Sequence, residues 1–445
     1  MLKLWLVTDL HFDGYDEGQP VTQSAAIFDA TLEAFLADPA CEILLIAGDL
    51  TNGSARDHAG LIPRLRRMQA AGKRVYVIYA THDYAHEDGF SFTKACPDDG
   101  GNPLDRPDGQ VYRSDLRGLY NAFGFEEALS EYGGSSYCAQ LAPGVRLLAL
   151  NDDGDGREFC GFYEEQMRWA ETQLTQAKED GQLVLAMTHH PSQPPSPIYP
   201  IISKKDMLGN YEENTRRLAD AGLRVMFTGH SHMHNISRLS TPAGSDYWDV
   251  NTGALGSFPS LYRVLTLEGS TLHVETLRTP DILWGPTGRL LREQFAADFD
   301  FMLRDLIESA DKNYDRFAHS LGGMTVSPAQ AYKLKLPLHL AGKLLNRVTL
   351  GGLGALLFCR RKVPKAVRKD SFKELFLELV RNIFSGEEKY GPDTPQGKAL
   401  LAFAKQLNLP LRKIVRGLGG KDAPSFLGSL IYDPLPDDAA EISLL

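Results

Sequence analysis

Five hydrophobic runs of this chain end in acidic or imidazole side chains, and this pattern constrains the fold more than any other feature. The runs close with the letters LVTDLH, LLIAGD, VIYATHD, VLAMTHH and VMFTGHSH. Short apolar runs of this kind predict buried strands. Open α/β sheets bind ligands in the crevice beyond the carboxyl ends of their strands, so we expect these polar side chains to share one crevice. The side chains are those of Asp9, His11, Asp49, His82, Asp83, His189, His230 and His232.

Carboxylates and imidazoles together bind hard and borderline metal ions. The set is too large for one structural zinc ion, and it suits two catalytic divalent metals that share a carboxylate. Asp49 follows Gly48 and is the predicted bridge. The mixed nitrogen and oxygen ligands suit Mn, Fe or Zn. Two such ions clamp the attacking and leaving oxygens of a displacement at phosphorus, with a bridging hydroxide as the predicted nucleophile.

The remaining polar residues of these blocks have predicted supporting roles. His82 lies just beyond the third expected strand, so we assign it to the leaving-group side, as a general acid or as a hydrogen-bond donor to the phosphoryl group. Asp83 would orient and charge His82. His190 and His234 are candidates for substrate contact or for support of the metal ligands, although an ordinary surface role is an equal alternative.

The first part of the chain alternates strand and helix signals, which predicts an α/β fold with a mostly parallel sheet at its start. Strand and turn signals continue to about residue 278, so we expect two sheets packed face to face with helices outside. The segment 84–132, rich in Gly, Asp and Pro, is an expected excursion near the active site, with one helix at 114–123. The other expected helices of this part are 21–36, 57–71, 164–178 and 211–221.

After residue 279 the pattern becomes helical. Apolar residues recur at helical spacing in 289–319, 328–345, 371–383 and 395–407. At 445 residues the chain is long enough for two domains. We therefore expect a catalytic domain at 1–285 and an all-helical domain at 286–445.

Charge and cysteine content narrow the function further. The net charge of −10 argues against non-specific binding of nucleic acid, but it leaves room for a small anionic substrate at a metal site. The five cysteines are scattered without a CxxC pair and indicate reduced thiols. The first residues predict a strand rather than a signal peptide. The longest apolar stretch, residues 348–359, is too short to span a bilayer, so we expect a cytoplasmic protein.

One segment of the helical part is strongly basic. Six Lys and Arg side chains fall within residues 360–369. Such a run usually forms a solvated face at the end of a helix. The alternative is contact with an anionic membrane or a protein partner, because an apolar run precedes it directly.

The ordered pattern DxH, GD, xxHD, HH and GHxH resembles the calcineurin-like metallophosphoesterase superfamily over roughly residues 1–280. The resemblance implies a four-layer α/β/β/α sandwich. It also implies one metal bound by Asp9, His11, Asp49 and His232, and a second bound by Asp49, His189 and His230. His189 is the implied ligand rather than His190, because it lies two residues before Pro191.

The third block departs from the superfamily pattern. It normally reads Gly-Asn-His-Asp/Glu, with the Asn amide on the second metal, whereas this chain has Ala80-Thr81-His82-Asp83. A hydroxyl is shorter and a weaker metal ligand than an amide carbonyl. Thr81 therefore either ligates the second metal weakly or leaves that position to water.

Within the superfamily, segments 119–141 and 251–267 and the helical C-terminal part resemble bacterial class III cyclic nucleotide phosphodiesterases. This resemblance implies hydrolysis of small nucleotide-type phosphodiesters, cyclic nucleotides among them. The alternatives are a phosphomonoesterase or protein phosphatase on the same site, and a catalytically weak scaffold protein.

Overall fold

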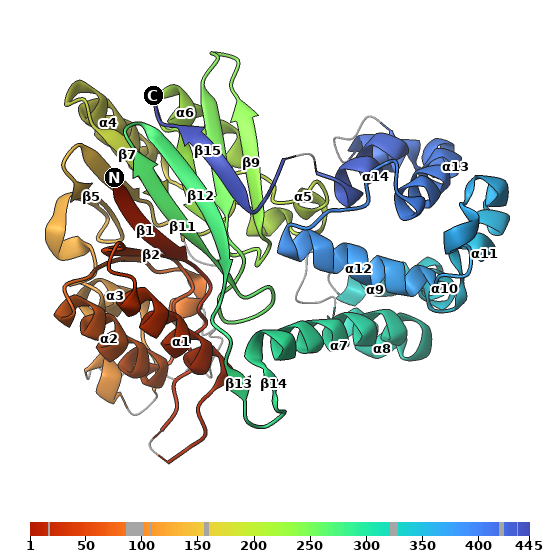
Figure 1. Ribbon diagram of the computed structural model, residues 1–445, viewed down its shortest axis with the longest axis horizontal. Coiled ribbons are helices and arrows are strands. Elements are labelled where there is room, and N and C mark those ends of the chain that lie inside the picture. The colour runs from red at the N-terminus through yellow and green to blue at the C-terminus, as the bar shows by residue number, and fades with distance from the viewer. Residues whose placement is uncertain are drawn as a thin grey trace. The chain divides into compact units, whose positions relative to one another are not determined.

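The computed structural model describes residues 1–445 except 17, 86–101, 107–108, 155–159, 321–327, 418–421 and 434. These residues form two compact units (Figure 1). The first unit contains residues 1–195, 205–295 and 437–445, and the second contains residues 196–204 and 296–436. The functional division at residue 285 remains a proposal.

The first sheet of the first unit has the strand order β15-β12-β11-β1-β2-β3. Strands β1, β2 and β3 are parallel, as the alternating sequence pattern predicts. Helices α1 (Gln23–Ala37) and α2 (Ala55–Ala70) belong to this half, and α2 begins with a capping box formed by Ser54 and Asp57. The strands are β1 Leu2–Val7, β2 Ile43–Ala47, β3 Arg74–Ile78, β11 Leu261–Glu268, β12 Thr271–Arg278 and β15 Ala439–Ser443.

The second sheet has the order β4-β5-β6-β7-β8-β10-β9, and its central strands β6, β7, β8 and β10 are parallel. Helices α4 (Glu164–Glu179) and α6 (Tyr211–Asp220) pack on its outer face through an apolar cluster that includes Leu148, Met167 and Leu218. The strands are β4 Ala128–Tyr132, β5 Ser136–Ala142, β6 Val145–Ala149, β7 Leu183–Met187, β8 Val225–Thr228, β9 Asn235–Ser240 and β10 Asp246–Asn251.

The main core lies between the two sheets. Leu6 and Leu45 of the first sheet and Leu147 and Val225 of the second belong to one buried apolar cluster. On the outer face of the first sheet, the rings of Trp5 and Phe35 meet edge to face, which anchors α1. The first unit is therefore an α/β/β/α sandwich of four layers (Figure 1).

The second unit is helical. Its core contains Leu350, Leu353 and Phe403. Helix α7 (Leu291–Lys312) leads into it from the first unit along the chain. The following helices are α8 Tyr314–Ser320, α9 Pro328–Lys333, α10 Lys335–Arg347, α11 Leu350–Leu356, α12 Phe372–Ser385, α13 Pro395–Gly417 and α14 Ala423–Ile431. Within the described residues, no helix combines the length and the apolar content that a membrane crossing requires.

Several elements differ from the sequence expectations. The first two residues of the helix expected at 289–319 form strand β14 (Arg289–Leu290), which pairs with β13 (Leu283–Trp284). The helix that follows is interrupted at Asn313. The helix expected at 328–345 divides at Leu334, and the one expected at 114–123 is α3, Arg113–Leu119. Much of the predicted excursion, residues 86–101 and 107–108, lies outside the described residues.

The largest difference concerns the end of the chain. The last residues were expected in the helical part, but β15 pairs antiparallel with β12 in the first sheet, where Leu272 opposes Ile442. Ile442 is fully buried. The local apolar pattern AAEIS is too weak to predict a strand, because the stability of β15 comes from a partner strand distant in the sequence.

Candidate metal centre

The five sequence blocks converge from both sheets. Three of them follow β1, β2 and β3, and two follow β7 and β8. Because neighbouring strands within each of these sets are parallel, their carboxyl ends lie at one edge of each sheet. The third block forms a short 3-10 helix, η1, at Thr81–Asp83.

Three groups of carboxylates and imidazoles form at this edge, and within each group the ligand atoms lie within 4.8 Å of one another. Asp49 belongs to two groups, because its Oδ2 lies 3.2 Å from His189 Nε2 and 3.7 Å from His11 Nε2. Asp9 Oδ1 lies 3.4 Å from His232 Nε2. The groups are Asp9, His11 and His232; His11, Asp49 and His82; and Asp49, His189 and His230.

Hydrogen bonds behind the imidazoles determine which nitrogen faces the centre. Nδ1 of His189 donates to the carbonyl of Ala47 at 2.9 Å, and Nδ1 of His11 donates to Oδ1 of Asn52 at 3.1 Å. Both bonds direct Nε2 toward the carboxylates. This is the orientation that a ring needs to bind a metal ion, with its other nitrogen held by a supporting group.

Two imidazole nitrogens of the proposed second metal site are left unsatisfied in the interior. Nε2 of His189 and Nδ1 of His230 are buried and have no hydrogen-bond partner within the described residues. A buried polar atom without a partner costs about 1–3 kcal/mol, so such atoms usually have a function. A divalent cation beside Asp49 would satisfy both nitrogens. The donor set at this edge therefore fits metal ions.

The backbone of the centre is strained. Five of the eight described non-glycine residues with a positive φ belong to it. Each such residue costs about 1–3 kcal/mol, and residues of this kind concentrate at functional sites. The five are Asp9 (φ 50°), His11 (43°), Asp49 (47°), His230 (62°) and His232 (55°).

Two glycines permit the close approach of the blocks. A Cβ atom at Gly48 would lie 2.3 Å from Nδ1 of His189, and one at Gly229 would lie 2.0 Å from Oγ1 of Thr8. Both distances are shorter than any van der Waals contact. The backbones of β2 and β8 can therefore enter the centre only without side chains at these positions.

The charges at the centre favour bound cations. Burial alone would raise the pKa of Asp49, but the nearby His189 and His82 hold that pKa well below its usual value. Burial also opposes ionisation of Asp9, yet His232 keeps its pKa low. The opposite effect is seen on His189: burial lowers its pKa, but Asp49 outweighs burial and raises that pKa to about 10. A proton on His189 thus balances the negative charge of Asp49, a role that a bound cation would also fill.

Thr81 and the two residues after it lie at the rim of the centre. Thr81 is buried in η1. His82 Nε2 lies 3.9 Å from Asp49 Oδ2, and burial lowers the pKa of His82 to about 4. The carboxylate of Asp83 accepts hydrogen bonds from the backbone N–H of Thr51 (2.7 Å) and of Ala80 (2.8 Å), and these contacts fix the loop that carries His82.

The histidines His190 and His234 have different surroundings. His190 is buried, its ring lies 4.1 Å from that of His230, and its Nδ1 is 3.1 Å from Oδ1 of Asp152. His190 therefore supports the centre from behind His230. Both ring nitrogens of the buried His234 are bonded, to Thr276 (2.8 Å) and to Gly253 (3.1 Å). This placement argues against the predicted substrate contact of His234 and for a structural role.

Sequence reasoning missed several supporting residues. Asp152 follows β6 and accepts hydrogen bonds from Oγ1 of Thr188 at 2.9 Å and from the backbone N–H of His190 at 2.7 Å. The polar triplet in LALNDDG, directly after a hydrophobic run, was the available signal. Oγ of Ser257 lies 3.2 Å from Nδ1 of His232, a contact that no local pattern predicts.

A cavity of about 510 Å³ borders the residues that follow β3 and β6. Its walls include the rings of Tyr79, Tyr132 and Tyr163 and the guanidinium groups of Arg113 and Arg117. Nε of Arg113 lies 3.9 Å from Oδ2 of the buried Asp153. The cavity thus combines aromatic surface with positive charge.

A sequence comparison identifies the family of the chain. Its result agrees with the four-layer fold and with the polar side chains at the carboxyl ends of the strands. A family model described as calcineurin-like phosphoesterase matches residues 2–234. This match spans more than half of the 445 residues, and the chain belongs to the calcineurin-like phosphoesterase family. Members of this family are metal-dependent phosphoesterases. A search of the curated proteins gave no match.

Three solved structures are similar to this chain at low sequence identity. A dimetal phosphatase from Danio rerio is 14% identical with a TM-score of 0.43, over 62% of this chain and 95% of that chain. A sulfate thiohydrolase SoxB from Thermus thermophilus, in complex with glycerol, is 12% identical with a TM-score of 0.32, over 68% and 60%. A 5'-nucleotidase precursor, also from Thermus thermophilus, is 12% identical with a TM-score of 0.35, over 69% and 60%.

Proposed function

We propose that the chain is a dinuclear metal-dependent phosphodiesterase that hydrolyses small nucleotide-type diesters, cyclic nucleotides among them. The observation that carries this proposal is the position of Asp49, which belongs to two groups of potential metal ligands at once. A carboxylate so placed can offer one oxygen to each of two ions, as dinuclear centres require. The unsatisfied buried nitrogens of His189 and His230 give further support.

The proposed ligands divide between two ions, which we assign to Mn, Fe or Zn because the donors are nitrogen and oxygen. When bound, such ions would polarise the phosphoryl group and lower the pKa of a water molecule between them. Thr81 is a candidate weak ligand of the second ion. We assign Asp9, His11, Asp49 and His232 to one ion and Asp49, His189 and His230 to the other.

His82 is the proposed group on the leaving-group side. With its pKa lowered by burial, the ring is neutral near pH 7 and carries one N–H that can donate to a phosphoryl oxygen. Asp83 holds the loop of His82 through its bonds to Thr51 and Ala80. In this proposal Asp83 is therefore a positioning residue and not a partner in proton transfer.

A diester substrate is favoured over a monoester by the nearby cavity. Tyr163, which is 45% exposed, offers a surface on which a base can stack, and Arg113 offers a cation to an anionic group. The same centre could serve a phosphomonoesterase or a protein phosphatase, which is the second candidate. We also propose a cytoplasmic location, since Cys41, Cys138 and Cys359 form no disulfide within the described residues.

The decisive experiment compares hydrolysis of bis-p-nitrophenyl phosphate with that of p-nitrophenyl phosphate, with and without chelator and added manganese, alongside elemental analysis. The proposal expects chelator-sensitive turnover, faster on the diester, with close to two metals per chain. Faster turnover of the monoester would favour the second candidate. Purified protein with neither metal nor turnover would contradict both and favour a scaffold role.

A further inference from the structure

The second unit carries the strongest charge segregation of the chain. Residues 316–369 contain eleven Lys and Arg and no Asp or Glu, although the whole chain has a net charge of −10. The other residues therefore share a net charge of −21. The basic run noted at 360–369 is the end of this longer segment. A cationic surface on an otherwise acidic protein indicates a specific anionic partner.

Helix α10 of this segment exposes apolar side chains. Leu336, Leu340 and Leu344 recur every four residues and are 70%, 54% and 40% exposed. Their spacing places them on one face of the helix. The other face packs on α7, where a Cβ at Gly342 would lie 2.7 Å from Cβ of Ala310. The leucine face is therefore not the face that this unit uses for its own packing.

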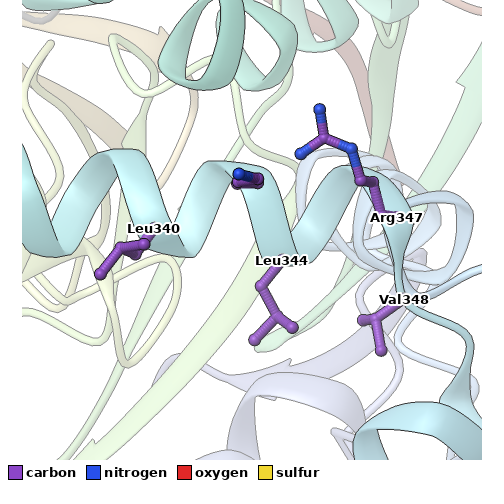
Figure 2. Close-up of a pocket in the computed structure, with 5 residues that line it drawn as sticks. Leu340, Leu344, Arg347 and Val348 are labelled. Carbon is purple, nitrogen blue, oxygen red and sulfur yellow. The ribbon is translucent and has the colours of Figure 1, made fainter.

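Figure 2 shows Leu340, Leu344 and Val348 on one side of the helix and Arg347 on the other. Together with Lys343 they line an open groove of about 360 Å³. Arg347 is paired with Asp311 at 2.9 Å, whereas no ion pair of Lys343 occurs among the described residues. The groove thus has an apolar wall beside a free cation.

Exposed apolar side chains beside basic ones occur again at the end of α11 and directly after it. Phe358 is 96% exposed and has a φ of 55°, an uncommon conformation for an aromatic residue. Leu356, two residues earlier, is 57% exposed. Exposed basic side chains follow directly, at Arg360, Arg361 and Lys362 in the 3-10 helix η6. We group Leu336, Leu340, Leu344, Leu356, Phe358 and the exposed Lys and Arg of 333–369 by their shared chemistry and call them the basic apolar surface.

We propose that the basic apolar surface docks this protein onto an anionic lipid bilayer. Amphipathic helices at membrane interfaces bury an apolar face among the acyl chains while Lys and Arg contact anionic headgroups. The leucines and Phe358 protrude into solvent, which suits insertion into a fluid better than docking into a rigid partner. The charge of the segment matches a negative surface. This inference goes beyond the proposed hydrolysis and does not depend on it.

The test uses the full chain and vesicles of phosphatidylcholine, either alone or with about one third phosphatidylglycerol, where each basic residue near the surface strengthens binding. We expect the protein to sediment with the anionic vesicles at low salt, to lose binding as salt rises, and to ignore the neutral vesicles. Equal binding to both vesicles, or none to either, would overturn the proposal. So would salt-sensitive binding to duplex DNA without vesicle binding.

Two variants separate the contributions of apolar and charged side chains. Phe358→Ser and the double change Arg360→Glu with Arg361→Glu should each weaken binding to anionic vesicles by at least about tenfold. The matched controls are Leu129→Ser, at a leucine as exposed as Leu356 (57% each), and Lys178→Glu, an exposed lysine of α4.

Both controls should bind like the unchanged protein, and variants that bound no worse than the controls would overturn the proposal. All four proteins should keep the unchanged thermal melting and the same rate of phosphoester hydrolysis, so that a failure of docking is separate from a failure of the active site.

Discussion

Two regions of this molecule reverse the usual distribution of polar and apolar side chains, in opposite directions. At the candidate metal centre, Asp9 and Asp49 are buried in the interior with exposures of 0% and 1%. On the basic apolar surface, Phe358 is 96% exposed. Buried polar groups and exposed apolar groups are the informative exceptions to normal burial. Both regions lack something that the chain itself does not supply within its described residues.

The two regions differ in how the missing partner is recognised. The centre holds its side chains at fixed separations on strained backbone, with five ligand candidates at positive φ. Fixed geometry selects a small ion with set ligand distances. The basic apolar surface has protruding, independently exposed side chains and selects a surface only by charge and hydrophobicity. Rigid, buried side chains thus suit a small ion, whereas separately exposed side chains suit a large surface such as a bilayer.

The largest expected effect is at the residue shared by two ligand groups. Asp49→Asn should lower kcat for bis-p-nitrophenyl phosphate by at least about 1,000-fold, because metal-ion stabilisation of the transition state is worth several kcal/mol. Metal content should fall at the same time. The half-exposed Asp13, changed to Asn, is the matched control and should keep full activity. Unchanged turnover in the Asp49 variant would exclude this centre as the site of hydrolysis.

The convergence of these side chains could be predicted from the sequence, because each block follows a strand whose apolar run is visible in the local sequence. His189 in VLAMTHH is an example, because a few residues show both the apolar run of a buried strand and the imidazole that can bind a metal. The supporting contacts could not be predicted, because Ser257 meets His232 and Asp152 meets His190 through tertiary structure alone. The strand β15 was missed for the same reason.

The second largest effect concerns stability. Chelation should destabilise the first unit by about 2.7 kcal/mol for each ion present at 100 times its Kd. All four tryptophans, at positions 5, 169, 248 and 284, lie in the first unit, so their fluorescence reports its unfolding separately. Helices of both units contribute to the far-ultraviolet dichroism, so we expect chelation to leave in that signal a second transition, from the helical unit, whose melting temperature does not change. An equal shift of both signals would mean that the two units unfold together.

A buried carboxylate with protein partners should behave differently from the proposed metal ligands. Burial raises the pKa of Asp249 to about 6, against hydrogen bonds from Ser192 and Thr228. The unfolded value is about 3.9, so between pH 4 and 6 the folded state keeps a proton that the unfolded state has lost. This stabilisation is complete below pH 4 and is lost as pH rises through 6, by on the order of 3 kcal/mol.

The test is urea unfolding at several pH values in chelator, followed by tryptophan fluorescence. Asp249→Asn cannot titrate, so its stability relative to the unchanged protein should rise between pH 4 and pH 6. Two parallel stability curves would show that Asp249 is already ionised in the folded state. Added metal should leave the difference between the two proteins unchanged, because Asp249 Oδ2 is already bonded to the backbone N–H of Ser192 at 2.7 Å and is not part of the centre.

The smallest expected effect lies at Thr81, where the centre departs from its family pattern. Thr81→Asn should tighten the second metal by about tenfold, equal to about 1.4 kcal/mol, because an amide carbonyl reaches further and is a better metal ligand than a hydroxyl. The isosteric Thr81→Val is the matched variant. If Val weakens metal binding, the hydroxyl itself is a ligand. If Val is neutral while Asn still tightens, water completes the second site in the natural protein.

Either result would show how one side chain acts in the fixed geometry of the candidate metal centre, in contrast to the basic apolar surface. Thr81 is buried and sits in η1 beside His82, so a gain in affinity there would come from one added ligand in an otherwise complete geometry. A single substitution on the basic apolar surface should weaken vesicle binding without abolishing it, because the contacts of that surface are summed over many exposed side chains. Unchanged metal affinity in the Asn variant, measured by competition with a chelator, would show that position 81 does not face the second ion.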